Sequence, residues 1–157
     1  MQPIIPDPEK WGKRPRNPPE KQEAKLQAEC VFWYRNVWYK NFRHLWATFN
    51  EGQDVNTKES MGLMPGASDL IYKETPGRGL IPLELKFPGE DHEVSRIIRQ
   101  AEFIMDVGDY GGFVDNLEQF QRIIQGENCW IDPVKVLKYC KSIKNKTLTW
   151  NKNLFEL

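Results

Sequence analysis

Two charged residues interrupt an otherwise apolar strand in the middle of this chain. Glu84 and Lys86 stand two residues apart in the segment Leu80-Ile-Pro-Leu-Glu-Leu-Lys86. Successive side chains of a strand point to opposite faces, so Glu84 and Lys86 share one face and Leu85 points the other way, into the core. Because a buried charge is costly unless it is paired, the fold must bring a partner or a metal ion to this face.

The turn that precedes this strand pairs it with a second strand, which begins at Asp69. Residues 74–79, Glu-Thr-Pro-Gly-Arg-Gly, predict the hairpin turn. Such a hairpin can bring Asp69 beside Glu84, and two adjacent carboxylates repel each other unless a cation is present. Mg²⁺ takes oxygen ligands, and the backbone carbonyl of Leu85 could supply another. Lys86 would then orient or deprotonate an attacking water, or stabilise a phosphate. An ordinary hairpin with a surface ion pair is the alternative interpretation.

Helix and strand patterns flank this hairpin on both sides. Apolar residues at spacings of three and four predict helices over residues 20–38 and 92–107, the second ended by Gly108. The other predicted elements are strands over 44–49 and 111–114, a polar loop or short helix over 53–62, helices from Asp115 or Asn116 to Ile124 and from Asp132 to Lys141, and a last strand or docking segment over 147–157. This order predicts an α/β fold with a central mixed β-sheet flanked by helices.

The first predicted helix carries a third candidate carboxylate. At roughly 100° per residue, Glu23, Gln27, Cys30 and Tyr34 fall on one side of this helix, so Glu23 points the same way as core-facing residues. Glu29 lies about 120° around the helix, and we expect it to be solvated. The alternative is that Glu23 is an ordinary first-turn residue favoured by the helix dipole.

Five segments of the chain, taken together, follow a known pattern. They are Glu23–Tyr34, Asn50-Glu-Gly52, Gly62-Leu-Met-Pro-Gly-Ala-Ser-Asp-Leu-Ile71, Pro82-Leu-Glu-Leu-Lys-Phe-Pro-Gly89 and Gln100 in the following helix. This pattern resembles the VRR-NUC domain, a branch of the PD-(D/E)XK nucleases, and the resemblance runs from about residue 20 to 125. It departs from the family at Ser68, where a proline is usual, and at Ile104, where many superfamily members have a tyrosine.

The resemblance implies a restriction-endonuclease-like core of the PD-(D/E)XK type in residues 20–126, with Mg²⁺ or Mn²⁺ as the cofactor. It also implies a role for each matching residue. The metal ligands would be Glu23, Asp69 and Glu84, together with the backbone carbonyl of Leu85, and the catalytic residues Asp69, Glu84, Lys86 and Gln100. A solvated helix position is the alternative for Gln100.

The activity that the resemblance implies is hydrolysis of phosphodiester bonds in DNA, selective for branched, flapped or junction structures. Standalone proteins of this family are typical of phages and are commonly dimers, so we expect a homodimer that acts on DNA in the bacterial cytoplasm. Two alternatives are a catalytically silent nucleic-acid-binding module and a phage factor that binds a host protein. The near-neutral pI of about 6.7 favours the last slightly, because nonspecific DNA binders are usually basic.

Charge is unevenly distributed along a chain whose net charge is zero. Residues 1–50 hold nine basic and five acidic residues, residues 51–129 hold seven and fifteen, and residues 130–157 hold six and two. The basic residues at the two ends of the chain could bind phosphate, and the acidic residues of the middle segment could bind a metal ion. A nuclease needs both. Solvated faces with no function are the alternative.

The two ends of the chain lie outside the predicted nuclease domain. Residues 1–19 hold six of the eleven prolines and predict an extended or disordered arm. We expect phosphate contacts from basic residues of this arm and of the loop that follows residue 50, namely Lys10, Lys13, Arg14, Arg16 and Lys58. A floppy terminus is the alternative for the arm. Residues 127–157 are expected to form a helical extension packed on the domain.

Several other features argue against other classes of protein. No apolar run approaches the 18 residues of a membrane span, and the N-terminus does not read as a signal peptide. The three cysteines form no CxxC pair, which predicts reduced thiols in a cytosolic protein. His92, within Glu90-Asp-His-Glu93, is expected to lie at the solvated start of a helix and not in a metal cluster.

Overall fold

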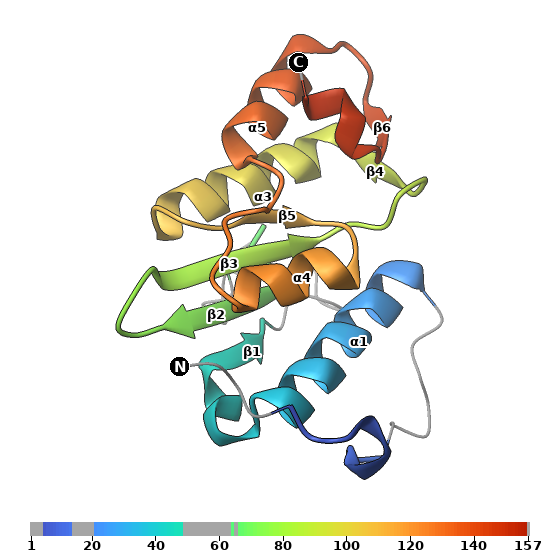
Figure 1. Cartoon of the computed structure of the whole chain (residues 1–157). Coiled ribbons are helices and arrows are strands. Elements are labelled where there is room, and N and C mark those ends of the chain that lie inside the picture. Colours follow the sequence, from blue (N-terminus) through green and yellow to red (C-terminus); the bar gives the residue numbers. More distant parts are fainter. Residues whose placement is uncertain (1–4, 14–20, 49–63, 65, 157) are drawn as a thin grey trace.

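The computed structural model describes residues 5–13, 21–48, 64 and 66–156. Its centre is a four-stranded sheet in the order β1-β2-β3-β5 (Figure 1). The strands are β1 (Leu45–Ala47), β2 (Leu70–Glu74), β3 (Gly79–Leu85) and β5 (Gly112–Val114). β1, β2 and β3 are antiparallel neighbours, whereas β5 is parallel to β3, so the predicted mixed sheet is confirmed.

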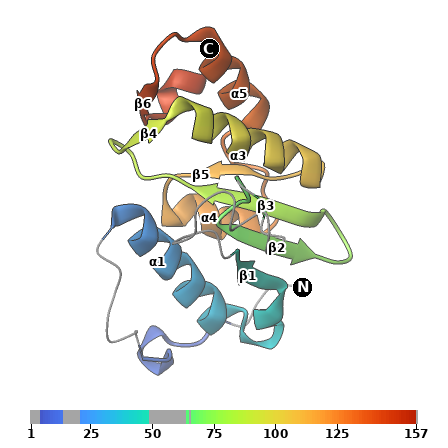
Figure 2. The same ribbon diagram turned by 180° about the vertical axis from the view of Figure 1, so that it is seen from behind.

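Helices flank this sheet, as the sequence predicted. They are α1 (Gln22–Val37), α3 (Val94–Val107) and α4 (Leu117–Ile124), while α5 (Pro133–Ser142) packs on α3 (Figure 1). Short 3₁₀ helices span Pro8–Lys10, Tyr39–His44 and Lys152–Phe155. α1 and β1 lie at one end of the molecule, and α5 lies with the C-terminus at the other, in both views (Figures 1 and 2).

The alternation of side chains along the sheet divides the core into two clusters. Leu83 and Leu85 of β3 are buried in one cluster with residues of α1 and α4, as predicted for Leu85. Phe113 of β5 is buried in the other cluster with residues of α3, α5 and the C-terminal segment. Glu84 alternates with Leu83 and Leu85 and therefore faces away from the first cluster, toward α3.

Pro82 lies inside β3, although proline is expected only near the start of a strand or at a sheet edge. The amide of Lys86 donates to Val114 of β5, so even-numbered residues of β3 direct their backbone groups to the β5 side. Pairing with β5 begins only at Leu83. The missing N–H of Pro82 therefore removes no ladder hydrogen bond.

The predicted starts of the two helices in the C-terminal part of the chain are confirmed by their N-cap residues, Asn116 and Asp132. Asn116 accepts a hydrogen bond from the amide of Gln119 at the start of α4, and Asp132 accepts one from Val134 at the start of α5. α3, however, begins at Val94 and not at residue 92, because residues 91–93 are extended.

These extended residues form a second sheet, of which the sequence predicted only one strand. β4 (Asp91–Glu93) pairs antiparallel with β6 (Thr147–Thr149), so His92 lies opposite Leu148. The possibility of a last strand in residues 147–157 is confirmed. Its partner could not be found locally, because the two strands are separated by more than fifty residues of chain.

The described part of the N-terminal segment contains a short 3₁₀ helix and packs on α1, whereas the prolines predicted an extended or disordered arm. Trp11 packs edge-on against Phe32 of α1, with ring centroids 5.6 Å apart, and its indole N–H donates to the carbonyl of Pro6. The amide of Gly12 donates to Asn36 Oδ1 over 2.7 Å. The aromatic contact overrides the local preference of the proline-rich segment.

Some predictions concern residues outside the described ranges. These are the loop or helix over 53–62, the motif Asn50-Glu-Gly52, the end of the strand over 44–49, and the DNA contacts of Arg14, Arg16 and Lys58. None of the helices in the described part of the chain is long and apolar enough to cross a membrane.

Candidate metal centre

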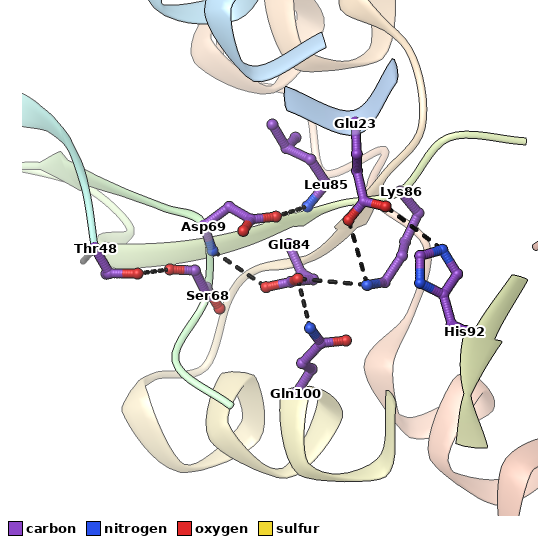
Figure 3. A network of polar contacts seen from close by, with 9 residues as sticks. All are labelled: Glu23, Thr48, Ser68, Asp69, Glu84, Leu85, Lys86, His92 and Gln100. Carbon is purple, nitrogen blue, oxygen red and sulfur yellow. Dashed lines mark hydrogen bonds and ion pairs between the residues drawn. The ribbon is translucent and has the colours of Figure 1, made fainter. Parts of the chain in front are cut away.

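Three carboxylates from three separate elements converge at one point. Glu23 lies in the first turn of α1, Asp69 directly precedes β2, and Glu84 lies near the end of β3. One oxygen of each carboxylate lies within 4.8 Å of the others (Figure 3). The predicted meeting of Asp69 with Glu84 and the predicted inward orientation of Glu23 are both present.

The register of the hairpin places Asp69 and Glu84 together. Leu70 pairs with Leu83, which puts the preceding Asp69 beside Glu84. The backbone N–H of Asp69 donates to Glu84 Oε2 over 3.1 Å, and the N–H of Leu85 donates to Asp69 Oδ2 over 2.9 Å. Each carboxylate is therefore held by a backbone group of the opposite strand.

The backbone of Leu85 faces the same point. Neighbouring residues of a strand direct their backbone groups to opposite sides, and the amide of Lys86 points to β5. The carbonyl of Leu85 therefore lies on the same side of β3 as its N–H, which is the side of Asp69.

Two further side chains hold Glu84 from the other side. Gln100 of α3 donates from Nε2 to Glu84 Oε1 over 2.7 Å, so it is not the solvated residue of the alternative interpretation. Lys86 Nζ lies 3.5 Å from Glu84 Oε1 and 3.5 Å from Glu23 Oε1 (Figure 3). The Lys86 side chain is only 1 % exposed, so these carboxylates are its immediate surroundings.

Burial of this cluster favours the protonated carboxyl groups. Burial raises the pKa of Glu84 well above its usual value, with repulsion from Asp69 adding to the effect and Lys86 opposing it. Burial also raises the pKa of Asp69, against the hydrogen bond from Leu85. The pKa of Glu23 rises to about 7, again mainly through burial. All three pKa values are raised, and a bound cation would lower them again because it favours the ionised carboxylates.

The chemistry of these residues fits a divalent cation. When ionised, the three carboxylates carry three negative charges and Lys86 carries one positive charge, which leaves two for a cation to balance. Oxygen ligands are what Mg²⁺ and Mn²⁺ prefer. Gln100 Oε1 is buried and has no hydrogen-bond partner among the described residues, so one more neutral oxygen lies near the cluster.

The expectation that His92 lies at the solvated start of a helix is wrong. Its side chain is 11 % exposed, and its Nε2 lies 3.5 Å from Glu23 Oε2. Burial, together with the positive charges of Lys86 and Arg96, lowers the pKa of His92 to about 4, so the imidazole is neutral at pH 7. Glu23, Glu90 and His92 form a second group whose ligand atoms lie within 4.8 Å of one another. The pairing of β4 with β6 places His92 opposite the buried Leu148, and no local pattern signals this contact.

The other described residues that the sequence singled out are not among the candidate ligands. Lys10 and Lys13 are exposed on the N-terminal segment, as a role in phosphate contact requires. Glu29 is partly buried where solvation was expected, and it belongs to neither group of candidate ligands. Ser68 and Ile104, which depart from the family pattern, are both buried.

Comparisons with known proteins do not identify a relative. No family model, curated protein or solved structure matches this chain.

Proposed function

We propose that this protein is a divalent-metal-dependent nuclease of the PD-(D/E)XK type, related to the VRR-NUC domain, that hydrolyses phosphodiester bonds in DNA. One observation carries the proposal. Glu23, Asp69 and Glu84 converge beside a buried lysine and the amide of Gln100, although they come from a helix, the residue before one strand and the interior of another. A structural ion pair would need one carboxylate for Lys86, whereas Lys86 contacts two and a third, Asp69, lies beside them.

The proposed metal ligands are the carboxylates of Glu23, Asp69 and Glu84 and the backbone carbonyl of Leu85. A divalent cation at this point supplies Lewis-acid stabilisation to the phosphate. The protein holds the ligands in place before the ion arrives, because backbone N–H groups already bind Asp69 and Glu84. Such preorganisation costs little reorganisation during the reaction.

Lys86 and Gln100 have separate proposed roles. Lys86 is a buried ammonium in contact with two of the ligands, so it can stabilise the charge that develops on the phosphate or orient the attacking water. Gln100 touches Glu84 and acts by fixing the orientation of that carboxylate.

The proposed substrate is branched, flapped or junction DNA in a bacterial cytoplasm, and the proposed assembly is a homodimer, since two active sites suit a junction with two strands to cut. Exposed Lys10 and Lys13 would contact phosphates outside the metal centre. Size-exclusion chromatography with light scattering, with and without junction DNA, tests the dimer.

A substrate panel tests the activity itself. Labelled single strand, duplex, flap, splayed arm and four-way junction are incubated with the protein in Mg²⁺, Mn²⁺ or EDTA. Cleavage is expected with either metal ion and not with EDTA. Lys86→Ala should lower the rate roughly 10²–10³-fold, the loss typical of one electrostatic group of an active site. Lys73→Ala, an exposed lysine on the same hairpin, is the matched control.

The panel also separates the alternative functions. DNA binding without metal-dependent cleavage on any substrate would identify a silent binding module. If the protein neither binds nor cleaves DNA, the remaining alternative is a factor that binds a host protein.

A further inference from the structure

The carboxylate of Glu23 has two sides, and each side faces a different set of ligands. Its Oε1 lies near Lys86, while its Oε2 lies 3.5 Å from His92 Nε2. Asp69 and His92 appear on opposite sides of Glu23 in Figure 3. Glu90 completes the second set, which lies within the same 4.8 Å limit as the first.

The second set is built by backbone contacts that involve the C-terminal segment. His92 is held opposite Leu148 by the pairing of β4 with β6. The amide of Trp150 donates to the carbonyl of Glu90 over 2.8 Å, and the amide of Gly89 donates to the carbonyl of Trp150 over 2.9 Å. Trp150 is itself buried in the core, so Glu90 and His92 are attached to a fixed part of the molecule.

His92 Nε2 is directed at this point without a conventional partner. The atom is buried and makes no hydrogen bond within the described residues, although it lies 3.5 Å from Glu23 Oε2. A buried nitrogen without a hydrogen bond is costly unless something else binds it. A cation shared with two carboxylates would satisfy it.

We propose that Glu23, Glu90 and His92 form a second cation site, which shares Glu23 with the Asp69 and Glu84 site. A set of one imidazole nitrogen and two carboxylates suits Mn²⁺ and similar transition metals better than Mg²⁺, which prefers oxygen ligands alone. The two sites would therefore differ in metal preference: the oxygen ligands beside Lys86 would hold Mg²⁺ or Mn²⁺, and the nitrogen-containing site would favour Mn²⁺ over Mg²⁺. This inference rests on the proposed function, because Glu23 serves both sites.

Electron paramagnetic resonance of the full-length protein with Mn²⁺ tests the proposal directly. Pulsed measurements detect a histidine nitrogen that is bound to Mn²⁺, and the chain has only two histidines. Wild type is expected to show this nitrogen coupling. His92→Gln should lose the coupling together with one bound ion per chain, and Asp69→Asn should keep the coupling. His44→Gln, which changes the other histidine, and Glu93→Gln, an exposed neighbour on β4, should resemble wild type.

Three results would overturn the second site. They are the absence of nitrogen coupling in wild type that binds Mn²⁺, coupling that persists in His92→Gln, and a Mn²⁺ stoichiometry that His92→Gln leaves unchanged. In each case, metal-dependent cleavage that is lost in Asp69→Asn would leave the proposed nuclease standing. A wild-type protein that binds no Mn²⁺ would overturn both proposals. Unfolding temperatures in EDTA show whether His92→Gln is folded, and Glu90→Gln supplies a second variant on the same site.

Discussion

Gln100 donates a hydrogen bond from Nε2 to Glu84 Oε1 over 2.7 Å, and this contact links α3 to the middle of the sheet. The other oxygen of Glu84 accepts the backbone N–H of Asp69. The orientation of the Glu84 carboxylate is therefore set from two elements at once. Contacts of this kind, one step removed from a metal ion, tune its affinity.

Gln100→Met is expected to weaken metal binding roughly 10–100-fold, because it keeps the side-chain volume but removes the donor that orients Glu84. The free energy of unfolding in EDTA should fall by about 1–3 kcal/mol, since a buried acceptor is deprived of one partner. Calorimetric titration with Mn²⁺ and chemical denaturation measure the two effects. Gln125→Met, at an exposed position after α4, is the control. Unchanged Mn²⁺ affinity in Gln100→Met would remove Gln100 from the site.

The stability of the metal-free protein should depend on pH through the raised carboxyl pKa values. Glu23 has a pKa of about 7 in the folded protein and 4.5 as its ordinary value, so the folded state binds more protons between these two. Stability from this group is complete below about pH 4.5 and is lost as pH rises through 7, with a slope of up to about 1.4 kcal/mol per pH unit for one proton. The raised pKa values of Asp69 and Glu84 act in the same direction.

Chemical denaturation in EDTA across this range measures the slope. Glu23→Gln should flatten the profile, and saturating Mn²⁺ should stabilise wild type more at pH 8 than at pH 6, because metal binding requires ionised carboxylates. A wild-type profile as flat as that of Glu23→Gln would contradict the assigned protonation of Glu23.

Glu23 and Glu29 lie on the same helix but only Glu23 reaches the candidate ligands. Glu23→Gln is expected to lower the cleavage rate roughly 10²–10³-fold, since it removes a charge from the site, and excess Mn²⁺ should restore part of the rate. Glu29→Gln should cleave DNA like wild type. Rates at saturating DNA for the two variants make the comparison, and a Glu29→Gln defect equal to that of Glu23→Gln would show that the helix register is wrong.

Lys10 and Lys13 are exposed on a segment that is attached to α1 through Trp11. Deleting this segment would also remove the packing of Trp11 on Phe32, so point substitutions give the cleaner test. Lys10→Ala with Lys13→Ala should weaken DNA binding and lower the salt slope by about 0.9 for each phosphate that is no longer neutralised. Fluorescence anisotropy at several salt concentrations measures the slope, with Lys73→Ala as the control. A slope equal to that of wild type would exclude the N-terminal segment from the DNA interface.

The strand and hairpin patterns of the sequence by themselves determined how Asp69, Glu84 and Lys86 are arranged in the site. Glu84 and Lys86 share a face and Leu85 enters the core because side chains alternate along any strand, whatever it packs against. The turn over residues 74–79 sets the register that brings Asp69 beside Glu84. The helical period alone predicted the side of α1 on which Glu23 lies. These relationships depend on residues close together in the chain.

Tertiary structure alone decided what Glu23 meets. The distance between Glu23 and the hairpin depends on how α1 packs against the sheet. The helical period predicts only the side of the helix on which Glu23 lies. His92 was expected at the solvated start of a helix, yet it is 11 % exposed and pairs with Leu148 of β6, more than fifty residues away. Trp11 likewise docks on Phe32 although the prolines around it favour an extended chain. In each case the burial of apolar residues distant in sequence outweighs local preference, and only the folded chain brings them together.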